Sequence, residues 1–301
     1  MDFIASPLRF RHVTFTAPTR GRLRSTHAIF TPIDLPDQLS LLPYDEETFL
    51  RSVFLQAELD IRAYRLETLK RRIPSCLRAL RTPSLDQARW MIRQKSGLLK
   101  VAINTLLIGV TSFFRDAPIF DSIRKSLPDL AASARRRGEG LRIWSAGCSD
   151  GAELYSIAML LAELGLMDDA DLLGTDCRLD ALTLARGGCY TADIIAGVPG
   201  ELLHKYFHRQ PTGWMVSEAI RNRVRWRSGD LLSLVEPGQW DMILCRNVAM
   251  YMRPEIARRL IANLAFALRP GGWLVLGKAE RPDSADVVSL VGPCLFRRDR
   301  G

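Results

Sequence analysis

A short segment near the middle of this chain constrains its fold more than any other. Residues 141–145 form an apolar strand pattern, the loop Ser145-Ala-Gly-Cys-Ser-Asp-Gly151 follows, and residues 153–164 have helical spacing. Gly147 and Gly151 allow the backbone to approach a ligand closely, and the first N–H groups of the helix face that ligand. This order of elements predicts an α/β fold with a small-molecule site at the end of the strand.

Further apolar strands alternate with helices along the second half of the chain. Such alternation is typical of a doubly wound, mostly parallel sheet that is covered by helices on both faces. Strands are predicted at residues 172–175, 241–245 and 273–276, and helices at residues 119–125, 179–187 and 254–267. We therefore expect a Rossmann-like domain over residues 108–301, in which Arg269-Pro-Gly-Gly272 is a tight turn before the last strand.

The alternation lapses between residues 190 and 227. Short β-like runs occur at residues 205–207, 214–216 and 224–226, and Pro211-Thr-Gly213 has the composition of a turn. This pattern predicts a small antiparallel β insertion, residues 190–227, within the α/β domain.

The N-terminal third of the chain has a different character. Residues 1–43 contain several prolines and no sustained periodicity, which predicts a poorly ordered arm. Residues 44–107 have helical spacing, and they begin with acidic residues 45–47 and contain a capping box at Ser84-Leu-Asp-Gln87. Pro74 is expected to break or restart the second helix. A small, basic, all-helical domain is therefore predicted at residues 44–107.

The net charge of +9 is concentrated in this helical region. Residues 65–100 contain ten Lys or Arg residues, against Glu67 and Asp86 only. Such a face suits an acidic partner, which could be nucleic acid, an anionic membrane surface or an acidic protein helix. An ordinary solvated surface is an equally good interpretation of the charge alone.

Several other classes of protein are disfavoured by what the sequence lacks. No apolar run reaches the length of a membrane span, and the arginine-rich start contains no apolar core of a secretory signal. The six cysteines include no C-x-x-C pair, so we expect reduced thiols in a cytoplasmic protein. His204 and His208, one helical turn apart, could form half a metal site, but without a third ligand no metal is expected.

The loop at residues 145–151 also indicates the class of its ligand. It is not a G-x-G-x-x-G motif, it has no P-loop lysine and it carries no basic residue, so a cofactor without phosphate groups is favoured. S-adenosylmethionine is such a cofactor. Asp176, after the second strand, can accept from ribose hydroxyls, Asp230 can accept from the adenine amino group, and Glu153 can meet the ammonium group of the methionine part. A turn or cap role for Asp176 and dipole compensation by Glu153 are the competing interpretations.

Four segments along the chain carry recognisable motifs. They are Leu107-Ile-Gly-Val-Thr-Ser-Phe-Phe-Arg-Asp116, Ile143-Trp-Ser-Ala-Gly-Cys-Ser-Asp-Gly-Ala-Glu-Leu-Tyr-Ser-Ile-Ala158, Leu244-Cys-Arg-Asn-Val-Ala-Met-Tyr251 and Leu268-Arg-Pro-Gly-Gly-Trp-Leu-Val-Leu-Gly277. The first three resemble the N-x-T-x-F-F-R-(D/E), W-S-A-x-x-S-x-G-E-E-P-Y-S-I-A and C-R-N-V-x-I-Y segments of one protein family, the CheR-type chemotaxis receptor methyltransferases, and the fourth resembles the closing turn of that family. The resemblance covers residues 43–296, and the combination is specific although each motif alone is weak.

This resemblance implies a reaction, a partner and a set of site residues. CheR-type enzymes transfer a methyl group from S-adenosylmethionine to receptor glutamates, which gives γ-methyl esters and S-adenosylhomocysteine. The implied partner is an acidic helical protein, a receptor cytoplasmic domain, and we expect a monomer that neither binds nucleic acid nor enters the membrane. Together with Gly147 of the loop, the implied cofactor contacts are Thr111, Arg115, Glu153, Asp176, Asp230, Leu231, Arg246 and Asn247.

The chemistry of ester formation agrees with this set. A carboxylate is already a nucleophile and a sulfonium is already a good leaving group, so in-line placement matters more than a strong base. Arg115 or Arg246 can hold a carboxylate with two hydrogen bonds, and Tyr251 can align one carboxylate oxygen. These three are the candidate catalytic residues. The alternatives are a salt bridge to a nearby acid for Arg115 and a packed ring with a backbone partner for Tyr251.

The chain departs from the family pattern at several positions. Gly109 stands where the family has Asn, Ala152 and Leu154 replace a Glu and a Pro, and Lys278 replaces the His of a G-H-S-E segment. A divergent member that binds the cofactor but methylates another substrate, or acts as a signalling adaptor, is therefore the alternative. A nucleic-acid methyltransferase is disfavoured, because Arg246-Asn-Val248 stands in place of an (N/D)-P-P-(Y/F) element.

Overall fold

The structure is a computed structural model that describes residues 37–107, 111–233, 239–283 and 287–299. Most of the arm expected at the N-terminus lies outside the described residues, and so does Gly109. The described part begins shortly before a 3-10 helix at Leu39–Leu41. Within these ranges, none of the helices combines the length and the hydropathy that crossing a membrane requires.

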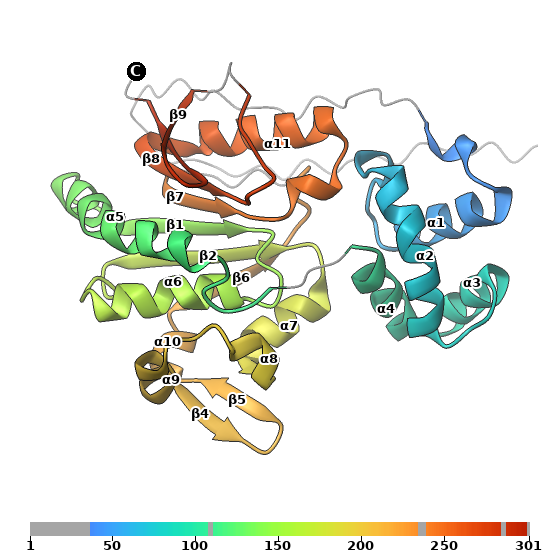
Figure 1. The fold of residues 1–301 in the computed structure, drawn as a ribbon, viewed down its shortest axis with the longest axis horizontal. Coiled ribbons are helices and arrows are strands. Elements are labelled where there is room, and N and C mark those ends of the chain that lie inside the picture. Colours follow the sequence, from blue (N-terminus) through green and yellow to red (C-terminus); the bar gives the residue numbers. More distant parts are fainter. Residues whose placement is uncertain (1–36, 108–110, 234–238, 284–286, 300–301) are drawn as a thin grey trace, which may run out of the picture. The chain divides into compact units, whose positions relative to one another are not determined.

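A seven-stranded sheet forms the centre of the described chain (Figure 1). Its strand order is β6-β2-β1-β7-β8-β10-β9. The first five strands run parallel, and β10 is antiparallel to both of its neighbours. This arrangement confirms the predicted doubly wound α/β fold. The strands are β1 (Leu141–Ala146), β2 (Ala170–Asp176), β6 (Val224–Ser228), β7 (Trp240–Cys245), β8 (Leu268–Leu276), β9 (Val288–Gly292) and β10 (Leu295–Arg298).

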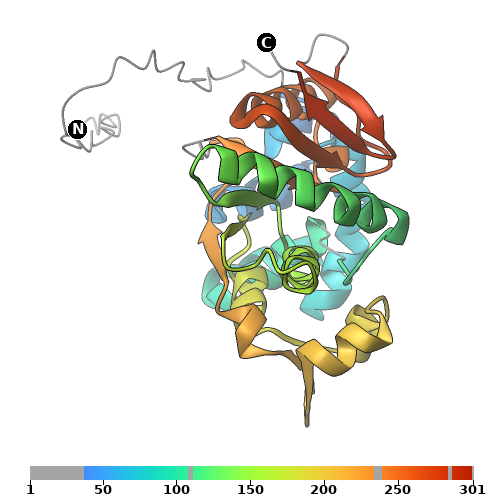
Figure 2. The same cartoon turned by 90° about the vertical axis from the view of Figure 1, so that its left-hand side faces the viewer.

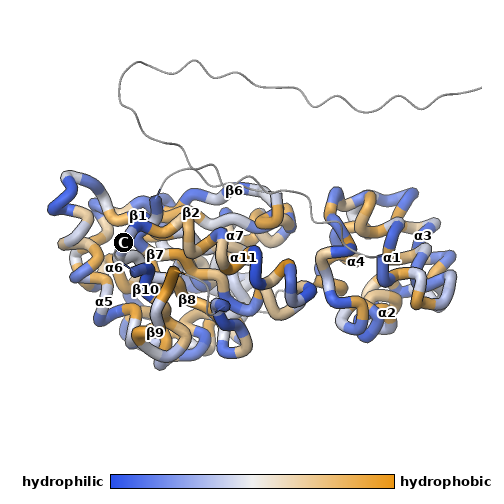
Figure 3. Tube along the Cα trace, turned by 90° about the horizontal axis from the view of Figure 1, so that it is seen from above, coloured by the Kyte–Doolittle hydropathy of each residue, from blue (hydrophilic) through white to orange (hydrophobic). Residues whose placement is uncertain are grey.

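Apolar cores lie on both faces of this sheet. Successive residues of β1 point to opposite faces, so Ile143 lies in one core and Trp144 in the other. The core around Ile143 includes side chains of α5 and α6, whereas the core around Trp144 includes those of α11. Figure 3 shows apolar residues concentrated along the central strands, as expected for a parallel sheet that is buried on both faces. The helices of the α/β part include α5 (Ala117–Arg136), α6 (Ala152–Glu163), α7 (Leu179–Gly187) and α11 (Pro254–Ala267).

Helices precede the sheet, as the sequence predicts. The hydroxyl of Ser84 accepts a hydrogen bond from the backbone N–H of Gln87 at 3.3 Å, so the predicted cap does begin a helix at this point. These helices share one core with the α11 face of the sheet. They are α1 (Tyr44–Gln56), α2 (Leu66–Leu80), α3 (Leu85–Gln94) and α4 (Ser96–Leu106).

Pro74 does not interrupt the second of these helices, so the predicted break was wrong. It lies in the interior of α2, which continues to Leu80. Leu69, Ile73 and Cys76 form a buried stripe at helical spacing on both sides of the proline. Burial of this stripe outweighs the one backbone hydrogen bond that a proline removes, because most helical stability in proteins comes from packing an amphipathic face.

Backbone contacts join the helical region to the chain that follows β7. Tyr64 forms an isolated antiparallel bridge with Met252. The backbone N–H of Arg65 donates to the carbonyl of Tyr251 at 3.0 Å, and its guanidinium Nε donates to the carbonyl of Met252 at 2.7 Å. The segment that carries Tyr251 is therefore held partly by residues between α1 and α2.

The insertion is a three-stranded antiparallel sheet with the order β3-β5-β4, which protrudes from the rest of the described chain (Figure 2). Two of the predicted β runs were assigned wrongly. Residues 205 and 206 end a helix, and residues 224–226 belong to β6, which pairs in parallel with β2 in the main sheet. The elements of the insertion are β3 (Cys189–Tyr190), α8 (Ala192–Ile195), α9 (Gly200–Tyr206), β4 (Phe207–Gln210) and β5 (Gly213–Val216), and α10 (Glu218–Arg221) leads back to the main sheet.

The misassigned run shows why local composition does not reveal a strand's partner. Trp226 packs on Gly174 of β2, where an added Cβ would lie 2.5 Å from the indole ring. A side chain at Gly174 would therefore clash with Trp226, so this glycine allows the indole to pack over β2 when β6 pairs with it. A short run of β-branched and aromatic residues fits any pleated, half-buried surface. Which sheet such a strand joins therefore depends on the neighbouring strand with which it pairs.

The turn predicted at residues 269–272 is a bulge inside β8. Trp240 of β7 pairs with Leu268 and Met242 pairs with Trp273, so the register shifts between these pairs. The extra residues of β8 leave the ladder there, and Gly271 adopts a φ of 82°. The glycine-rich composition was interpreted correctly as a departure from regular structure, but the strand starts before it.

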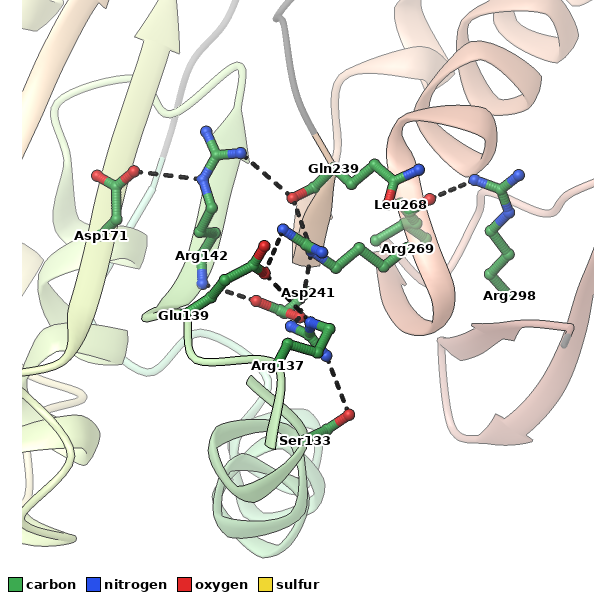
Figure 4. A network of polar contacts seen from close by, with 10 residues as sticks. All are labelled: Ser133, Arg137, Glu139, Arg142, Asp171, Gln239, Asp241, Leu268, Arg269 and Arg298. Atoms are coloured by element: carbon green, nitrogen blue, oxygen red, sulfur yellow. Dashed lines mark hydrogen bonds and ion pairs between the residues drawn. The ribbon is translucent and has the colours of Figure 1, made fainter. Parts of the chain in front are cut away.

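A network of charged side chains closes the amino-terminal edge of the sheet, and Figure 4 shows Arg137 and Arg269 pointing toward Asp241. The Asp241 side chain is only 3% exposed. It accepts from the guanidinium of Arg137 at 2.5 Å and from the backbone N–H of Arg142 at 2.9 Å. Glu139 bridges the two arginines, at 3.2 Å from Arg137 and 2.6 Å from Arg269. One buried carboxylate thus joins the end of α5 to β1 and β7.

Replacing Asp241 with alanine should destabilise the protein strongly. The change leaves the Arg137 guanidinium and the Arg142 N–H without their buried acceptor, so we expect the free energy of unfolding to fall by about 3 kcal/mol in urea titrations. Asp168→Ala is the matched control, since the Asp168 side chain is 99% exposed and pairs with Arg223 at the surface. Its effect should stay below about 0.5 kcal/mol. Equal losses in the two variants would contradict this role of Asp241.

Candidate functional site

A cleft opens where the parallel strands β1, β2, β6 and β7 end. It encloses about 990 Å³ including its mouth, which suits a small organic molecule. In a doubly wound sheet, ligands bind at this carboxyl edge, where the chain leaves neighbouring strands in opposite directions. Every residue that the sequence placed in the site lines this cleft. They are Thr111, Arg115, Gly147, Glu153, Asp176, Asp230, Leu231, Arg246, Asn247 and Tyr251.

The loop after β1 forms the floor of the cleft through close backbone packing. The N–H groups of Gly147 and Cys148 both donate to the carbonyl of Thr175 on β2, at 2.8 and 2.9 Å. Gly147 has a φ of 77°, and a Cβ at this residue would lie 2.6 Å from the Val248 side chain after β7. Glycine at 147 is therefore required both by its backbone conformation and by the neighbouring loop.

Asp176 lies at the end of β2 and accepts hydrogen bonds from several donors. The backbone N–H groups of Ser149 and Arg178 donate to it at 2.8 and 2.9 Å. The Arg178 guanidinium adds contacts from Nε at 3.1 Å and from Nη2 at 3.3 Å. Asp176 is 5% exposed, and Arg178 lines the cleft beside it. The sequence pointed to Asp176 by its place after a strand, but nothing in the local pattern indicated Arg178.

A chain of ionic contacts runs from the surface into the cleft. Lys278 Nζ lies 2.5 Å from Asp116 Oδ1, and Asp116 Oδ2 accepts from Arg246 Nη2 at 2.7 Å. Arg246 Nη1 then reaches Glu153 Oε2 at 3.2 Å, and Glu153 Oε1 accepts from the Ser145 hydroxyl at 2.9 Å. Burial opposes ionisation of Asp116, but its hydrogen bond to Lys278 and the charge of Arg246 outweigh burial and lower the pKa of Asp116.

Arg246 is committed to these internal partners. Its side chain is 2% exposed, and Nη2 also donates to the carbonyl of Arg115 at 2.8 Å. Its Nε is buried and has no hydrogen-bond partner among the described residues. Of the two arginines that were candidates for holding a carboxylate, Arg246 already binds Glu153 and Asp116. Arg246 therefore has few donors left for a substrate carboxylate.

Asp230 and Tyr64 form another part of the cleft wall. Burial raises the pKa of Asp230, although its Oδ1 accepts from the backbone N–H of Leu232 at 3.0 Å. Tyr64, which lies between α1 and α2, packs edge-on against Phe54 at 5.3 Å, and burial raises its pKa well above the ordinary value. Sequence reasoning missed Tyr64, because its place in the cleft depends on the bridge to Met252 and not on any local motif.

Glu280 is a further residue whose role sequence reasoning missed. Its carboxylate, in a residue that is 3% exposed, accepts from the backbone N–H groups of Asn247 at 3.0 Å, Val248 at 2.9 Å, Met250 at 3.2 Å and Gly277 at 2.7 Å. Asn247 has a φ of 60°, a left-handed conformation that asparagine tolerates better than most residues. One carboxylate therefore fixes the loop that carries Asn247 and leads to Tyr251.

The histidines and cysteines do not form a metal site in the part of the chain that the structure describes. No group of three or more His, Cys, Asp or Glu side chains is suitably placed for an ion in this part. His204 lies in α9, which ends at Tyr206, and His208 lies in β4. The two histidines are therefore not one turn apart on a single helix, contrary to the expectation from the sequence. All six cysteines are free thiols.

The charges of the cleft are balanced. Carboxyl groups come from Glu153, Asp176 and Asp230, and guanidinium groups come from Arg115, Arg178 and Arg246. Carboxylates suit hydroxyl, amino and cationic groups of a ligand, whereas a guanidinium suits a carboxylate. The site can therefore bring a nucleoside with a positively charged amino-acid tail next to a carboxylate.

Comparison with known proteins assigns this site to a family. Residues 109–291 match the model of the CheR methyltransferase SAM-binding domain. The chain belongs to the CheR methyltransferase family. It is thus a methyltransferase that uses S-adenosylmethionine, and the cleft at the carboxyl edge is where a doubly wound fold holds such a cofactor.

Several curated relatives cover most of this CheR family member. Chemotaxis protein methyltransferase 1 of Pseudomonas aeruginosa is 35% identical over 218 residues, which are 68% of this chain and 79% of that protein. Chemotaxis protein methyltransferase Cher2 of Pseudomonas putida is 35% identical over 202 residues, which are 64% of this chain and 73% of that protein. A chemotaxis protein methyltransferase of Listeria monocytogenes is 30% identical over 234 residues, which are 77% and 88% of the two chains.

Replacing Glu280 with glutamine should weaken cofactor binding as well as stability. The amide keeps one acceptor oxygen but turns an N–H donor toward backbone N–H groups, so at least one of these groups loses its acceptor. We expect S-adenosylhomocysteine to bind about tenfold more weakly in calorimetric titrations, because Asn247 and Val248 line the cleft. Glu218→Gln is the control, since the Glu218 side chain is 80% exposed. Unchanged affinity in Glu280→Gln would refute this role.

Asp150, in the loop after β1, should make stability depend on pH. Burial raises the pKa of Asp150 to about 6 from 3.8, although its Oδ1 accepts from the backbone N–H of Ala152 at 3.2 Å. The folded protein keeps this proton to a higher pH than the unfolded chain does. The carboxyl group therefore contributes stability at low pH that is lost as the pH rises through about 4 to 6.

Asp150→Asn should remove this loss, because the amide does not ionise and can still accept from Ala152. We expect the variant to exceed the wild type in free energy of unfolding by about 2–3 kcal/mol near pH 7.5, with the difference shrinking toward pH 4.5. Asp121→Asn, at an exposed position of α5, should show no such trend. Denaturant titrations across this pH range measure the difference, and a pH-independent gap would speak against the assignment.

Proposed function

We propose that this enzyme methylates glutamate side chains of a chemoreceptor-like signalling protein and produces glutamyl methyl esters. One observation carries the proposal: Arg115 and Tyr251 line the same cleft as the carboxylates that suit the cofactor. The curated relatives described above are named chemotaxis protein methyltransferases, which supports a receptor as the substrate.

The reaction needs placement rather than a strong base. S-adenosylmethionine supplies a methyl group on a positively charged sulfur. A glutamate oxygen forms a bond to the methyl carbon while the carbon–sulfur bond breaks, and the electron pair of that bond stays on sulfur. The glutamate is already ionised near neutral pH, so no proton has to move. The protein contributes by holding the carboxylate in line with the methyl group.

Each side chain of the cleft has a role in this proposal. Arg115 holds the substrate carboxylate with paired hydrogen bonds, and the Tyr251 hydroxyl aligns one of its oxygens. Arg246 does not contact the substrate in this scheme. It is bound to Glu153 and Asp116 and fixes the positions of both side chains. The residues that hold the cofactor in this scheme are Thr111, Gly147, Glu153 toward the ammonium group, Asp176 toward the ribose, Asp230 toward the adenine amino group, Leu231 and Asn247.

The helical region supports an acidic helical protein as the partner. Basic residues of α2 to α4 and of the turns between them are exposed. Such an excess of positive charge attracts acidic helices and speeds their encounter. We propose a receptor cytoplasmic domain in this place, methylated by a monomeric enzyme in the cytoplasm. The exposed basic residues are Lys70, Arg71, Arg78, Arg81, Arg93, Lys95 and Lys100.

Methyl transfer to receptor fragments should depend on Tyr251. With tritiated S-adenosylmethionine, we expect base-labile radioactive methanol from receptor fragments that contain glutamate, and Tyr251→Phe should lower kcat by about 10- to 100-fold. Affinity for S-adenosylhomocysteine should change little, because the ring of residue 251 remains.

Tyr44→Phe serves as the matched control, since Tyr44 is 78% exposed on α1 and should leave kcat unchanged. Intact cofactor binding with no methanol release from any receptor fragment would favour a signalling adaptor or another substrate and sink the proposal.

A further inference from the structure

The carboxylate of Asp176 already accepts as many hydrogen bonds as it can. A carboxylate has about four lone-pair positions, two on each oxygen. Oδ1 accepts from the backbone N–H and the Nε of Arg178, at 2.9 and 3.1 Å. Oδ2 accepts from the backbone N–H of Ser149 at 2.8 Å and from Nη2 of Arg178 at 3.3 Å. No position is left for a ligand hydroxyl while all four contacts are made.

Only two of these contacts can be given up without moving the backbone. The N–H groups of Ser149 and Arg178 belong to the loop after β1 and to the start of α7, whose positions the sheet fixes. The other two contacts come from the flexible guanidinium of Arg178, and they reach one oxygen each. A ribose diol also offers two donors side by side. The guanidinium and the diol therefore need the same two acceptor positions.

We propose that Arg178 determines cofactor affinity by occupying the Asp176 acceptor positions that a ribose diol uses, so that the nucleoside binds by displacing the guanidinium. This inference rests on the placement of the ribose at Asp176 that is proposed above. The Arg178 side chain is 10% exposed and lines the cleft beside Asp176, so it lies next to the position proposed for the ribose. The sequence motifs assign no role to Arg178.

The displaced guanidinium keeps a negative neighbour. Burial lowers the pKa of Arg178, but the charge of Asp176 and the hydrogen bonds to it raise this pKa, and the charge of Asp180, in the first turn of α7, acts in the same direction. Asp180 also accepts from the side-chain amide of Asn104 on α4. A guanidinium that leaves Asp176 therefore still feels the negative charge of Asp180, and this lowers the cost of the displacement.

The consequence is opposite to the usual expectation for a residue that lines a ligand site. Removing the Arg178 side chain removes a competing donor, so two acceptor positions of Asp176 become available to the ribose hydroxyls. Arg178→Met, which has no donors and a similar length, should bind S-adenosylhomocysteine about tenfold more tightly than the wild type. The gain should disappear for ligands without the diol, because those ligands do not compete for Asp176.

Calorimetric titration of the full chain tests this directly. The probes are S-adenosylhomocysteine, adenosine and 2′,3′-dideoxyadenosine, and the proteins are the wild type, Arg178→Met and Arg186→Met. Arg186 is exposed on the same helix, so its variant makes the same change of charge away from the cleft. We expect tighter binding of the first two probes only by Arg178→Met, and the same binding of dideoxyadenosine by all three proteins.

Each result of these titrations either supports or overturns the inference. Unchanged or weaker binding of S-adenosylhomocysteine by a folded Arg178→Met variant would overturn it. If Arg178→Met has a much lower Tm, Arg178→Lys is used as the test in its place. Lysine keeps the positive charge but lacks the paired donors of the guanidinium. Arg178→Lys should therefore bind S-adenosylhomocysteine more tightly than the wild type, by a smaller factor than expected for Arg178→Met. An equal gain for dideoxyadenosine would mean a general charge effect and would also overturn it. No receptor is present in these titrations, so their result is independent of whether glutamates are methylated.

Discussion

The buried guanidinium of Arg246 holds together the chain segments that form the cleft. It follows β7, and it binds Glu153 at the start of α6 as well as Asp116 and the carbonyl of Arg115 before α5. Buried charges are tolerated only when they are paired and hydrogen-bonded. The partners of Arg246 therefore fix where these three segments lie, and the segments form one side of the cleft.

Much of the site could be predicted because its residues follow strand ends in the local sequence. Asp176 comes at the end of β2, Asp230 soon after β6, and Arg246 and Asn247 directly after β7. In a doubly wound sheet all such positions meet at one edge. The strand before Asp176 was assigned to the main sheet from its pattern, whereas the run before Asp230 was assigned to the insertion and belongs to β6. Arg246 and Asn247 were placed in the site by the resemblance to the CheR family.

The features that were missed depend on contacts between distant parts of the chain. Glu280 fixes a loop that begins 33 residues earlier, and nothing in the sequence around it indicates that partner. Pro74 stays inside α2 because of what the helix packs against, and β6 pairs with β2 of the main sheet, where Gly174 leaves room for Trp226. Local patterns report propensity, whereas these outcomes were decided by packing partners that only the folded chain brings together.

The bridge between Tyr64 and Met252 has a consequence for how this protein can diverge. The junction between the basic helices and the catalytic segment includes main-chain hydrogen bonds, such as the one from Arg65 to Tyr251. Main-chain contacts depend little on which side chains are present. Substitutions on the outer surfaces of the helices can therefore accumulate while these main-chain contacts persist, so the surface that we propose for receptor binding can change without loss of the junction.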